Sequence, residues 1–436
     1  MASDTRVLAH QVNSSAVGGI LTGMFDAHFF SANRDALRAK LGGAVAVLAG
    51  NGLLQRKRDT TFPFAQESNV WYVCGVDQPD IVIIVGRQAK DDALIIPERS
   101  AVQEAFNGQL QADDLARKSG VQTVLRAKEA YEYINALVSK SKKGYMYSLD
   151  ASSSYNKHGQ FFVNPAQRRT QEKLRRHFPR IEFRELRPLI AELRVIKQPA
   201  EVRAIQHAID YTSEALRSIQ IDLEAQRLHS EQAIEAYITY QFSTQGAQGH
   251  AYDPIVASGA NATTLHYVAN NSLLAKDAFV VLDVGAEVHG YAADITRTYA
   301  FGTVSQRHKE LYMAVHEVQA AAIQQLRPGL TFREFETSVR SHLAAKLHEL
   351  GLAQSTSDTV ALERYYPHAT THFLGLDVHD VGDYNKPLQP GMVITCEPGL
   401  YILEEKIGIR LEDDILITET GHQNLSASCP KQAYSV

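Results

Sequence analysis

The sequence predicts an α/β fold divided into two domains, 1–187 and 188–436, with the boundary near Arg187-Pro188. Three observations support this prediction. The 436 residues exceed a single domain of roughly 150 residues. Apolar residues make up 44% and charged residues 21% of the chain, the balance of a folded globular protein. Short apolar runs alternate with helical patterns on both sides of the boundary, which is typical of α/β proteins.

In the first half, residues 35–41 predict a helix that ends at Gly42-Gly43. Gln78-Pro79-Asp80 predicts a turn that leads into an apolar strand. Buried strands are expected at 44–49, 81–85 and 93–96.

In the second half, Pro199 suits the first turn of a helix, and residues 199–219 place Val202, Ile205 and Ile209 on one apolar stripe. Further helices are expected at 230–243, 306–326 and 331–350. Strands are expected near 255–258, 279–286, 291–300, 392–397 and 407–418. Polar residues of unusual type gather in this half, so the chemistry is expected there.

Composition excludes several classes of partner. Lys plus Arg number 44 against 49 Asp plus Glu, and no basic block offers a stripe for nucleic acid. No apolar run approaches the ~20 residues that span a bilayer, so a membrane partner is not expected. Three scattered cysteines without a CxxC pair favour a reducing compartment, and the N-terminus has no signal pattern. A cytoplasmic protein is therefore expected.

The strongest local signal is a predicted hairpin over residues 279–298. If its turn is centred on Val288 and His289, Asp283 faces Asp294 with Cβ atoms ~4.5–5.5 Å apart. Two carboxylates that close on an apolar hairpin need a proton, a cation or a metal ion between them. The alternative is that one Asp lies at a strand end in water.

Two glutamates occupy similar positions further along the chain. Glu397 follows an apolar strand and precedes a Pro-Gly turn, where α/β folds tend to place reactive groups. Glu412 follows a strand with a period of two that places Arg410 on its face, so Arg410 is expected to brace the Glu412 carboxylate. Taken singly, an exposed turn acid and a surface ion pair of little energy are the alternatives.

Histidines complete the set. His368, His372 and His379 lie within twelve residues, and His266 follows a run of small residues. Histidine serves both as a metal ligand and as a proton carrier. Two Asp, two Glu and at least one His suit hard divalent ions, with Mn²⁺ favoured and Co²⁺ or Zn²⁺ as alternatives. Their negative charge suffices for two ions, which activate water and polarise a carbonyl.

Four segments, in order, resemble the pita-bread metallopeptidases that cleave Xaa-Pro bonds, namely aminopeptidase P and prolidase of family M24B. They are 290–298, 372–382, 397–401 and 408–414. A weaker likeness of 62–75 and 79–80 to the N-terminal domain of aminopeptidase P extends the resemblance to residues 33–427. It implies an N-terminal α/β domain of the creatinase/aminopeptidase P type, for substrate access and oligomerisation, followed by a pita-bread catalytic domain.

The resemblance also implies roles for individual residues. The ligands of two divalent metal ions would be Asp283, Asp294, His372, Glu397 and Glu412. Glu397 would in addition carry a proton to the leaving nitrogen, and Arg410 would orient the bridging acid.

Further roles concern the substrate. His379 and His266 would hold the scissile carbonyl and the substrate, and His368 would line the proline pocket. Tyr252 and Tyr401 fall at positions near the metals.

The implied activity is hydrolysis of the Xaa-Pro bond at the N-terminus of peptides. Short segments between Gly382 and Gly391 and over 397–410, together with the tail 416–421, favour an aminopeptidase over a dipeptidase of the prolidase type. The run Ala369-Thr370-Thr371 departs from the glycine-containing run of the family. This departure keeps a non-peptidase pita-bread protein, either a creatinase-like enzyme or a binding protein, as a further alternative. Proline-containing peptides are the expected partners, and a homodimer or homotetramer is the expected assembly.

Overall fold

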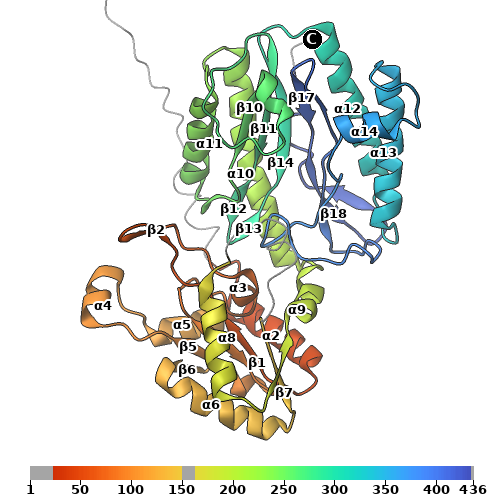
Figure 1. Ribbon diagram of the computed structural model, residues 1–436. Coiled ribbons are helices and arrows are strands. Elements are labelled where there is room, and N and C mark those ends of the chain that lie inside the picture. The colour runs from red at the N-terminus through yellow and green to blue at the C-terminus, as the bar shows by residue number, and fades with distance from the viewer. Residues whose placement is uncertain (1–22, 150–162, 434–436) are drawn as a thin grey trace, which may run out of the picture.

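The computed structural model describes residues 23–149 and 163–433, which form two α/β bodies (Figure 1). One contains the chain up to β8 and the other begins with α10, with α9 (Arg187–Arg194) at their junction. This confirms the predicted fold class. None of the helices in these described ranges has both the length and the apolar character that crossing a membrane requires.

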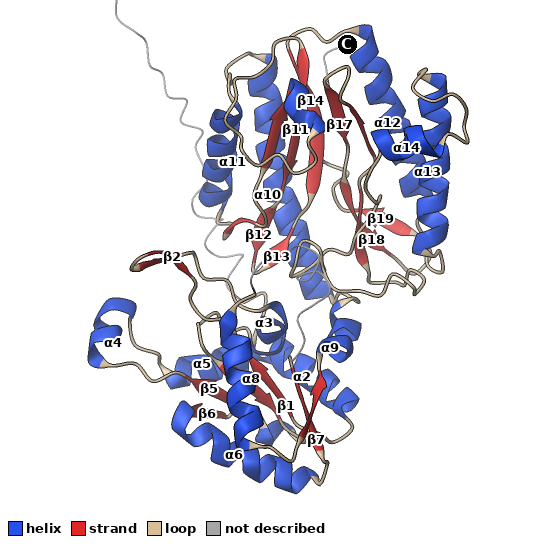
Figure 2. Ribbon diagram, viewed as in Figure 1, coloured by secondary structure: helices blue, strands red, loops and turns tan. Residues whose placement is uncertain are grey.

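The N-terminal body is built on a mixed sheet of six strands in the order β6-β5-β4-β1-β7-β8 (Figure 2). Its strands are β1 (Ala46–Ala49), β4 (Val82–Val85), β5 (Ala93–Ile96), β6 (Thr123–Arg126), β7 (Tyr145–Ser148) and β8 (Glu182–Glu185). Its helices are α2 (Ala27–Leu41), α3 (Ser68–Cys74), α4 (Ala101–Asn107), α5 (Ala112–Ser119), α6 (Ala127–Ser141) and α8 (Pro165–His177). Short elements are β2 (Gln55–Lys57), β3 (Thr60–Thr61) and η1 (Ala89–Asp91).

Strand side chains alternate between two cores, as a period of two requires. Ala46 and Leu48 of β1 pack toward α2, α3 and α9, whereas Val47 packs toward α6 and α8. Because helices cover both faces, every residue of β1 is buried.

The C-terminal body places its strands between two groups of helices (Figure 2). The helices are α10 (Pro199–Glu224) and α11 (Glu231–Gln245) on one side, and α12 (Gln306–Gln325), α13 (Phe332–Glu349) and α14 (Thr359–Tyr365) on the other. The strands are β9 (Gly249–His250), β10 (Ile255–Ser258), β11 (Ala278–Val284), β12 (Ala286–Val288), β13 (Tyr291–Ala292), β14 (Ile295–Phe301), β15 (Val393–Cys396), β16 (Gly399–Ile402), β17 (Ile407–Arg410), β18 (Asp413–Ile417) and β19 (His422–Asn424), with the short helix η2 (Gly259–Thr263).

The predicted elements are present, with several differences in extent. The helix expected at 199–219 continues to Glu224, and the strand expected at 279–286 is interrupted at Gly285. The first helix begins at Ala27 instead of residue 35, because the Asp26 carboxylate accepts a hydrogen bond from the Phe29 amide and caps it. The strand expected at 407–418 is two strands, since β17 pairs with β16 whereas β18 pairs with β15 and β19. The segment 291–300 is likewise divided into β13 and β14.

The predicted register of the 279–298 hairpin is wrong by two residues. β11 pairs with β14 so that Asp283 lies opposite Thr296, and Asp294 is its diagonal neighbour on the same face. The turn is His289-Gly290, with φ of 52° and 80°. Two positive φ values are the signature of the type I′ turn that matches strand twist. Glycine adopts this conformation without strain, and it stands at the second position.

Candidate metal centre and active site

A cavity of about 1710 Å³ lies between the two bodies and is lined by both. Residues 63–69 line it from the N-terminal body. Ten of the eleven site residues that the sequence predicts line it from the C-terminal body: Tyr252, His266, Asp283, Asp294, His368, His372, His379, Glu397, Arg410 and Glu412. The exception is Tyr401, which lies in the adjoining wall.

Two aspartates meet at one tyrosine. The Tyr252 hydroxyl lies 2.6 Å from Asp283 Oδ1 and 2.6 Å from Asp294 Oδ1, so it holds the two carboxylates together. Gly285 permits this approach, because a Cβ atom there would lie 1.8 Å from the Ala293 carbonyl oxygen and 2.9 Å from the Tyr252 ring. The interruption between β11 and β12 therefore places both acids on one wall.

The imidazole of His372 completes the cluster. Its Nε2 atom lies 3.3 Å from Asp294 Oδ2, 3.6 Å from Glu397 Oε1 and 3.9 Å from Glu412 Oε1. Ligand atoms of Asp294, His372 and Glu412 all lie within 4.8 Å of one another. His372 Nδ1 lies 3.0 Å from the Phe373 carbonyl oxygen, which can only accept, so Nδ1 donates and Nε2 is left as a ligand atom.

Burial of this cluster disfavours the charged form of its carboxyl groups. Burial raises the pKa of Asp283, raises that of Glu397 to about 7 and raises that of Glu412 well above its usual value. Burial alone would lower the pKa of His372. The Asp294 and Glu397 carboxylates outweigh this effect and raise the pKa of His372 to about 9. Such a site favours bound cations, and four carboxylates with one imidazole fit divalent metal ions.

Arg410 contacts a different acid from the one expected. Its Nη2 atom donates to Asp283 Oδ2 at 2.6 Å, and its Nε atom donates to Thr296 Oγ1 at 3.1 Å. Thr296 Oγ1 in turn donates to Glu412 Oε2 at 2.7 Å. The predicted direct brace between Arg410 and Glu412 is therefore replaced by a link through Thr296 of β14, and Arg410 pairs with Asp283 instead.

A hydrogen-bonded chain joins Arg410 to His368. Arg410 Nη1 donates to the Tyr401 hydroxyl at 3.0 Å, and that hydroxyl lies 2.9 Å from His368 Nε2. Burial first, and the Arg410 charge second, lower the pKa of His368 to about 4. The ring is therefore neutral and accepts from Tyr401, while its Nδ1 donates to the Ala369 carbonyl oxygen. Both ring nitrogens are therefore hydrogen-bonded, and His368 lines the cavity.

The other two predicted histidines lie at the cavity surface. The His379 ring contacts His372 edge-on with centroids 4.4 Å apart. Desolvation, and then the His372 charge, lower the pKa of His379 to about 4. His266 is exposed and comes from the segment that follows η2.

The run Ala369-Thr370-Thr371 adopts an ordinary backbone, since none of these residues has a positive φ. Thr370 Oγ1 lies 2.7 Å from the hydroxyl of Tyr366, and its amide donates to Glu336. Thr371 Oγ1 is buried and has no hydrogen-bond partner in the described part of the chain. The departure from the family pattern therefore alters the cavity wall without straining the backbone.

Two residues beside the cluster were not predicted from the sequence. Thr296 connects Arg410 with Glu412, and the Asp414 carboxylate accepts a hydrogen bond from the Asp294 amide at 3.1 Å. Thr296 could have been found from the Asp-x-Thr spacing only if the hairpin register had been known.

Comparisons with known proteins agree with this geometry. Residues 203–419 match Metallopeptidase family M24, and residues 30–147 match the aminopeptidase P N-terminal domain. Xaa-Pro aminopeptidase 3 of Mus musculus is 32% identical over 88% of this chain and 78% of its own length. The Xaa-Pro aminopeptidase of Escherichia coli (strain K12) is 31% identical over 92% of this chain and 95% of its own length. The structure of proline aminopeptidase P II from Yersinia pestis matches with a TM-score of 0.81 at 29% identity, covering 93% of this chain and 97% of that one.

The fold, together with the cluster of acidic and imidazole side chains, is that of a metallopeptidase. The chain belongs to metallopeptidase family M24, and it combines an N-terminal domain of the aminopeptidase P type with a C-terminal pita-bread domain. Membership in this family implies divalent metal ions.

Proposed function

We propose that the protein is a metal-dependent Xaa-Pro aminopeptidase that removes the N-terminal residue from peptides with proline in second position. The single observation that supports this most is the convergence of Asp283, Asp294, His372, Glu397 and Glu412 on one cavity wall. Relatives named Xaa-Pro aminopeptidase that align over most of the chain add to it.

These five residues would hold two divalent ions, for which we propose Mn²⁺. Carboxylate oxygens outnumber the single imidazole, and Mn²⁺ prefers such oxygen-rich sites, with Co²⁺ or Zn²⁺ as alternatives. When bound, divalent ions supply Lewis acidity that polarises the scissile carbonyl and lowers the pKa of water.

The protein's own residues would then orient the peptide and move a proton. Glu397, whose Oε1 atom lies 3.6 Å from His372 Nε2, would carry a proton to the leaving nitrogen. His379 and His266, at the cavity surface, would hold the scissile carbonyl and the substrate. Arg410 fixes the Asp283 carboxylate, and Tyr252 keeps the two aspartates together.

Proline selectivity would come from a site beside the cluster that is shaped to accept the pyrrolidine ring of proline. The neutral ring of His368, which is hydrogen-bonded to the Tyr401 hydroxyl and lines the cavity, would pack against a pyrrolidine ring. An X-Pro bond has no N–H, so an enzyme that accepts it needs no group to satisfy that hydrogen. The alternatives are a prolidase and, less strongly supported, a non-peptidase binding protein of the same fold.

Product analysis of Ala-Pro and Ala-Pro-Ala-Ala, side by side with added Mn²⁺, tests the proposal. Release of alanine from the tetrapeptide is expected, and E397Q serves as the inactive control. Cleavage of the dipeptide alone would assign a prolidase. Hydrolysis of neither peptide, with no bound metal, would assign the binding protein.

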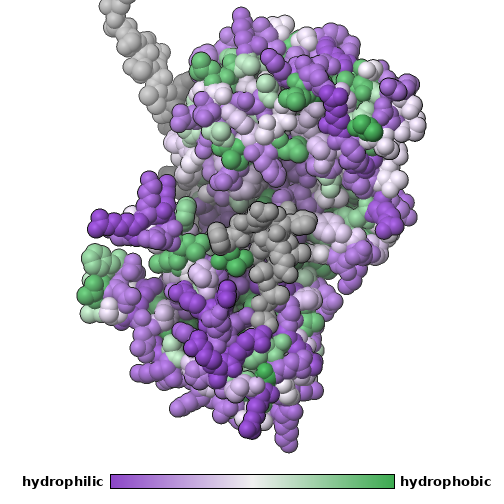
Figure 3. Space-filling model, viewed as in Figure 1, coloured by the Kyte–Doolittle hydropathy of each residue, from purple (hydrophilic) through white to green (hydrophobic). Residues whose placement is uncertain are grey.

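We also propose the division into domains at 1–187 and 188–436, with the first supporting a dimer or tetramer. Support comes from α4, where Val102 and Phe106 are 65% and 84% exposed and the surface is apolar in Figure 3. Light scattering should give a dimer or tetramer that F106S weakens, whereas a monomeric wild type would contradict this.

A cytoplasmic location is proposed because Cys74, Cys396 and Cys429 are free, buried thiols.

A further inference from the structure

A fully buried carboxyl group lies behind the active-site cavity and has no part in the proposed mechanism. It belongs to Glu231, the first residue of α11, which is 0% exposed. Glu231 is not among the described residues that line the cavity. Burying a carboxyl group costs free energy unless its oxygens accept hydrogen bonds, so the partners of Glu231 show what it holds in place.

Four donors meet the two oxygens of Glu231. Oε1 accepts from the Ser258 amide at 3.0 Å and from Asn261 Nδ2 at 2.8 Å. Oε2 accepts from the Tyr267 hydroxyl at 2.9 Å and from the Ser272 amide at 2.9 Å. All four donors therefore come from one part of the chain, residues 258–272, which we call the 258–272 segment.

The 258–272 segment follows β10 and precedes β11. Glu231 fixes it at both ends and at two points between them. The Glu231 amide adds a further bond, because it donates to the Ser272 carbonyl oxygen at 3.0 Å. Since one side chain makes four of these contacts, replacing it would loosen the whole segment at once.

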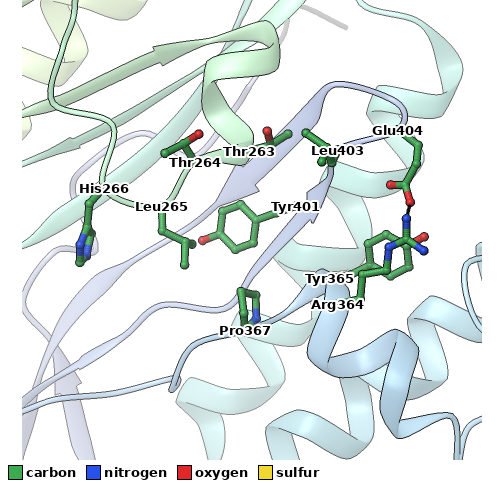
Figure 4. Close-up of a pocket in the computed structure, with 10 residues that line it drawn as sticks. All are labelled: Thr263, Thr264, Leu265, His266, Arg364, Tyr365, Pro367, Tyr401, Leu403 and Glu404. Carbon is green, nitrogen blue, oxygen red and sulfur yellow. Dashed lines mark ion pairs between the residues drawn. The ribbon is translucent and has the colours of Figure 1, made fainter.

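The same segment carries His266 to the cavity. Figure 4 shows the His266 side chain leaving the stretch that follows η2, beside Leu265. Its other neighbour, Tyr267, is hydrogen-bonded to Glu231 and packs against the apolar cluster that contains Val281 of β11. One peptide bond joins Tyr267 to His266, so an anchored Tyr267 restrains the position of His266, which is itself exposed.

We propose that Glu231 is a positioning residue that holds His266 where it meets the peptide substrate. Glu231 acts at a distance, because its hydrogen bonds go to none of the proposed metal ligands. The inference rests on the proposed function, in which His266 holds the substrate. A residue that only stabilised the fold would affect turnover equally with and without His266, and this difference makes the role testable.

A double-mutant cycle separates the two roles. It compares kcat/KM for Ala-Pro-Ala-Ala with Mn²⁺ in the wild type, E231Q, H266A and E231Q/H266A, with alanine release followed by mass spectrometry so that slow turnover is detected. Glutamine cannot accept from all four donors, because its Nε2 atom is itself a donor. Misplacing a group by about 1 Å can cost about 10²-fold, so a partial shift in E231Q should lower kcat/KM about tenfold. In the H266A background E231Q should change kcat/KM by less than about twofold.

Y267F is a second variant, which keeps the test decisive if E231Q fails to fold. It removes only the hydroxyl that donates to Glu231, from a half-buried side chain. It should lower kcat/KM in the wild-type background and not in the H266A background. Y133F is the matched control, because the half-buried Tyr133 donates its hydroxyl to the Asp91 carbonyl oxygen in the N-terminal body and does not line the cavity. Its kcat/KM should equal that of the wild type.

The outcomes separate this inference from the proposed function. An equal loss of kcat/KM in both backgrounds, or wild-type kcat/KM in E231Q and Y267F, would overturn the positioning role and leave the aminopeptidase intact. A wild-type protein that does not hydrolyse Ala-Pro-Ala-Ala would instead overturn the proposed function.

Discussion

Asp380 lies next to His379 and is held by two buried cations. Its Oδ1 atom lies 2.5 Å from Arg194 Nη2, and its Oδ2 atom lies 2.8 Å from Lys197 Nζ. All three side chains are at most 2% exposed. Burial alone would raise the pKa of Asp380, but the Arg194 and Lys197 charges outweigh it and keep the pKa below its usual value. Asp380 is therefore ionised and pairs with both cations, while Asp377 is a second acidic partner of Arg194.

Replacing Asp380 with Asn removes this charge and keeps the shape. The amide oxygen still accepts one hydrogen bond, but Lys197 loses its counter-ion, and Arg194 keeps the Asp377 carboxylate and its hydrogen bond to Asn69. Removing one partner of a buried ion pair costs about 3–5 kcal/mol, and the retained hydrogen bond favours the lower end. For a domain of this size, about 3 kcal/mol lowers the unfolding midpoint by roughly 6–12 °C.

Thermal unfolding of D380N and of the wild type, followed by circular dichroism, measures this effect. D383N is the matched control, because Asp383 is an exposed carboxylate on the same loop, and its midpoint should stay within about 2 °C of the wild type. A D380N midpoint as close to the wild type as that of D383N would refute the assignment of Asp380 as the buried counter-ion.

Three further predictions concern buried groups. Burial raises the pKa of Glu201 from 4.5 to about 7, so the folded state binds this proton more tightly than the unfolded state does. Relative to E201Q, the wild type should therefore lose about 3 kcal/mol of unfolding free energy as the pH rises from about 4.5 to 7. Urea unfolding at a series of pH values measures this loss, and parallel pH profiles of the two proteins would contradict it. Y252F removes the hydroxyl between the two aspartates and should weaken Mn²⁺ binding about 10–100-fold by calorimetry, whereas wild-type affinity would show that the hydroxyl is dispensable. G285A brings a Cβ atom into the Ala293 carbonyl and should destabilise the fold by about 3 kcal/mol, and an unchanged urea midpoint would contradict that contact.

The proposed ligand set could be predicted because four segments of the sequence resemble the pita-bread metallopeptidases, whereas each local segment taken singly left an alternative open. Asp283 and Asp294 interrupt an apolar hairpin, and Glu397 and Glu412 follow apolar strands. Most helices and strands were also predictable, since their apolar periods match the faces that the two bodies bury.

Contacts between distant segments could not be predicted in this way. The hairpin register depends on a positive φ at His289, which is uncommon for a residue with a Cβ atom. Arg410 is 127 residues from Asp283, and their ion pair depends on how separate sheets pack. The pairing of Arg194 with Asp380 spans 186 residues and has no local signature.

Metal stoichiometry tests the central claim most directly. Wild-type protein dialysed against Mn²⁺ and analysed by elemental mass spectrometry should hold two ions per chain. E412Q removes one carboxylate of the buried cluster and should reduce this number, whereas E419Q, an exposed glutamate nearby, should not. Absence of bound metal from the wild type, or E412Q with the full wild-type content, would contradict the account.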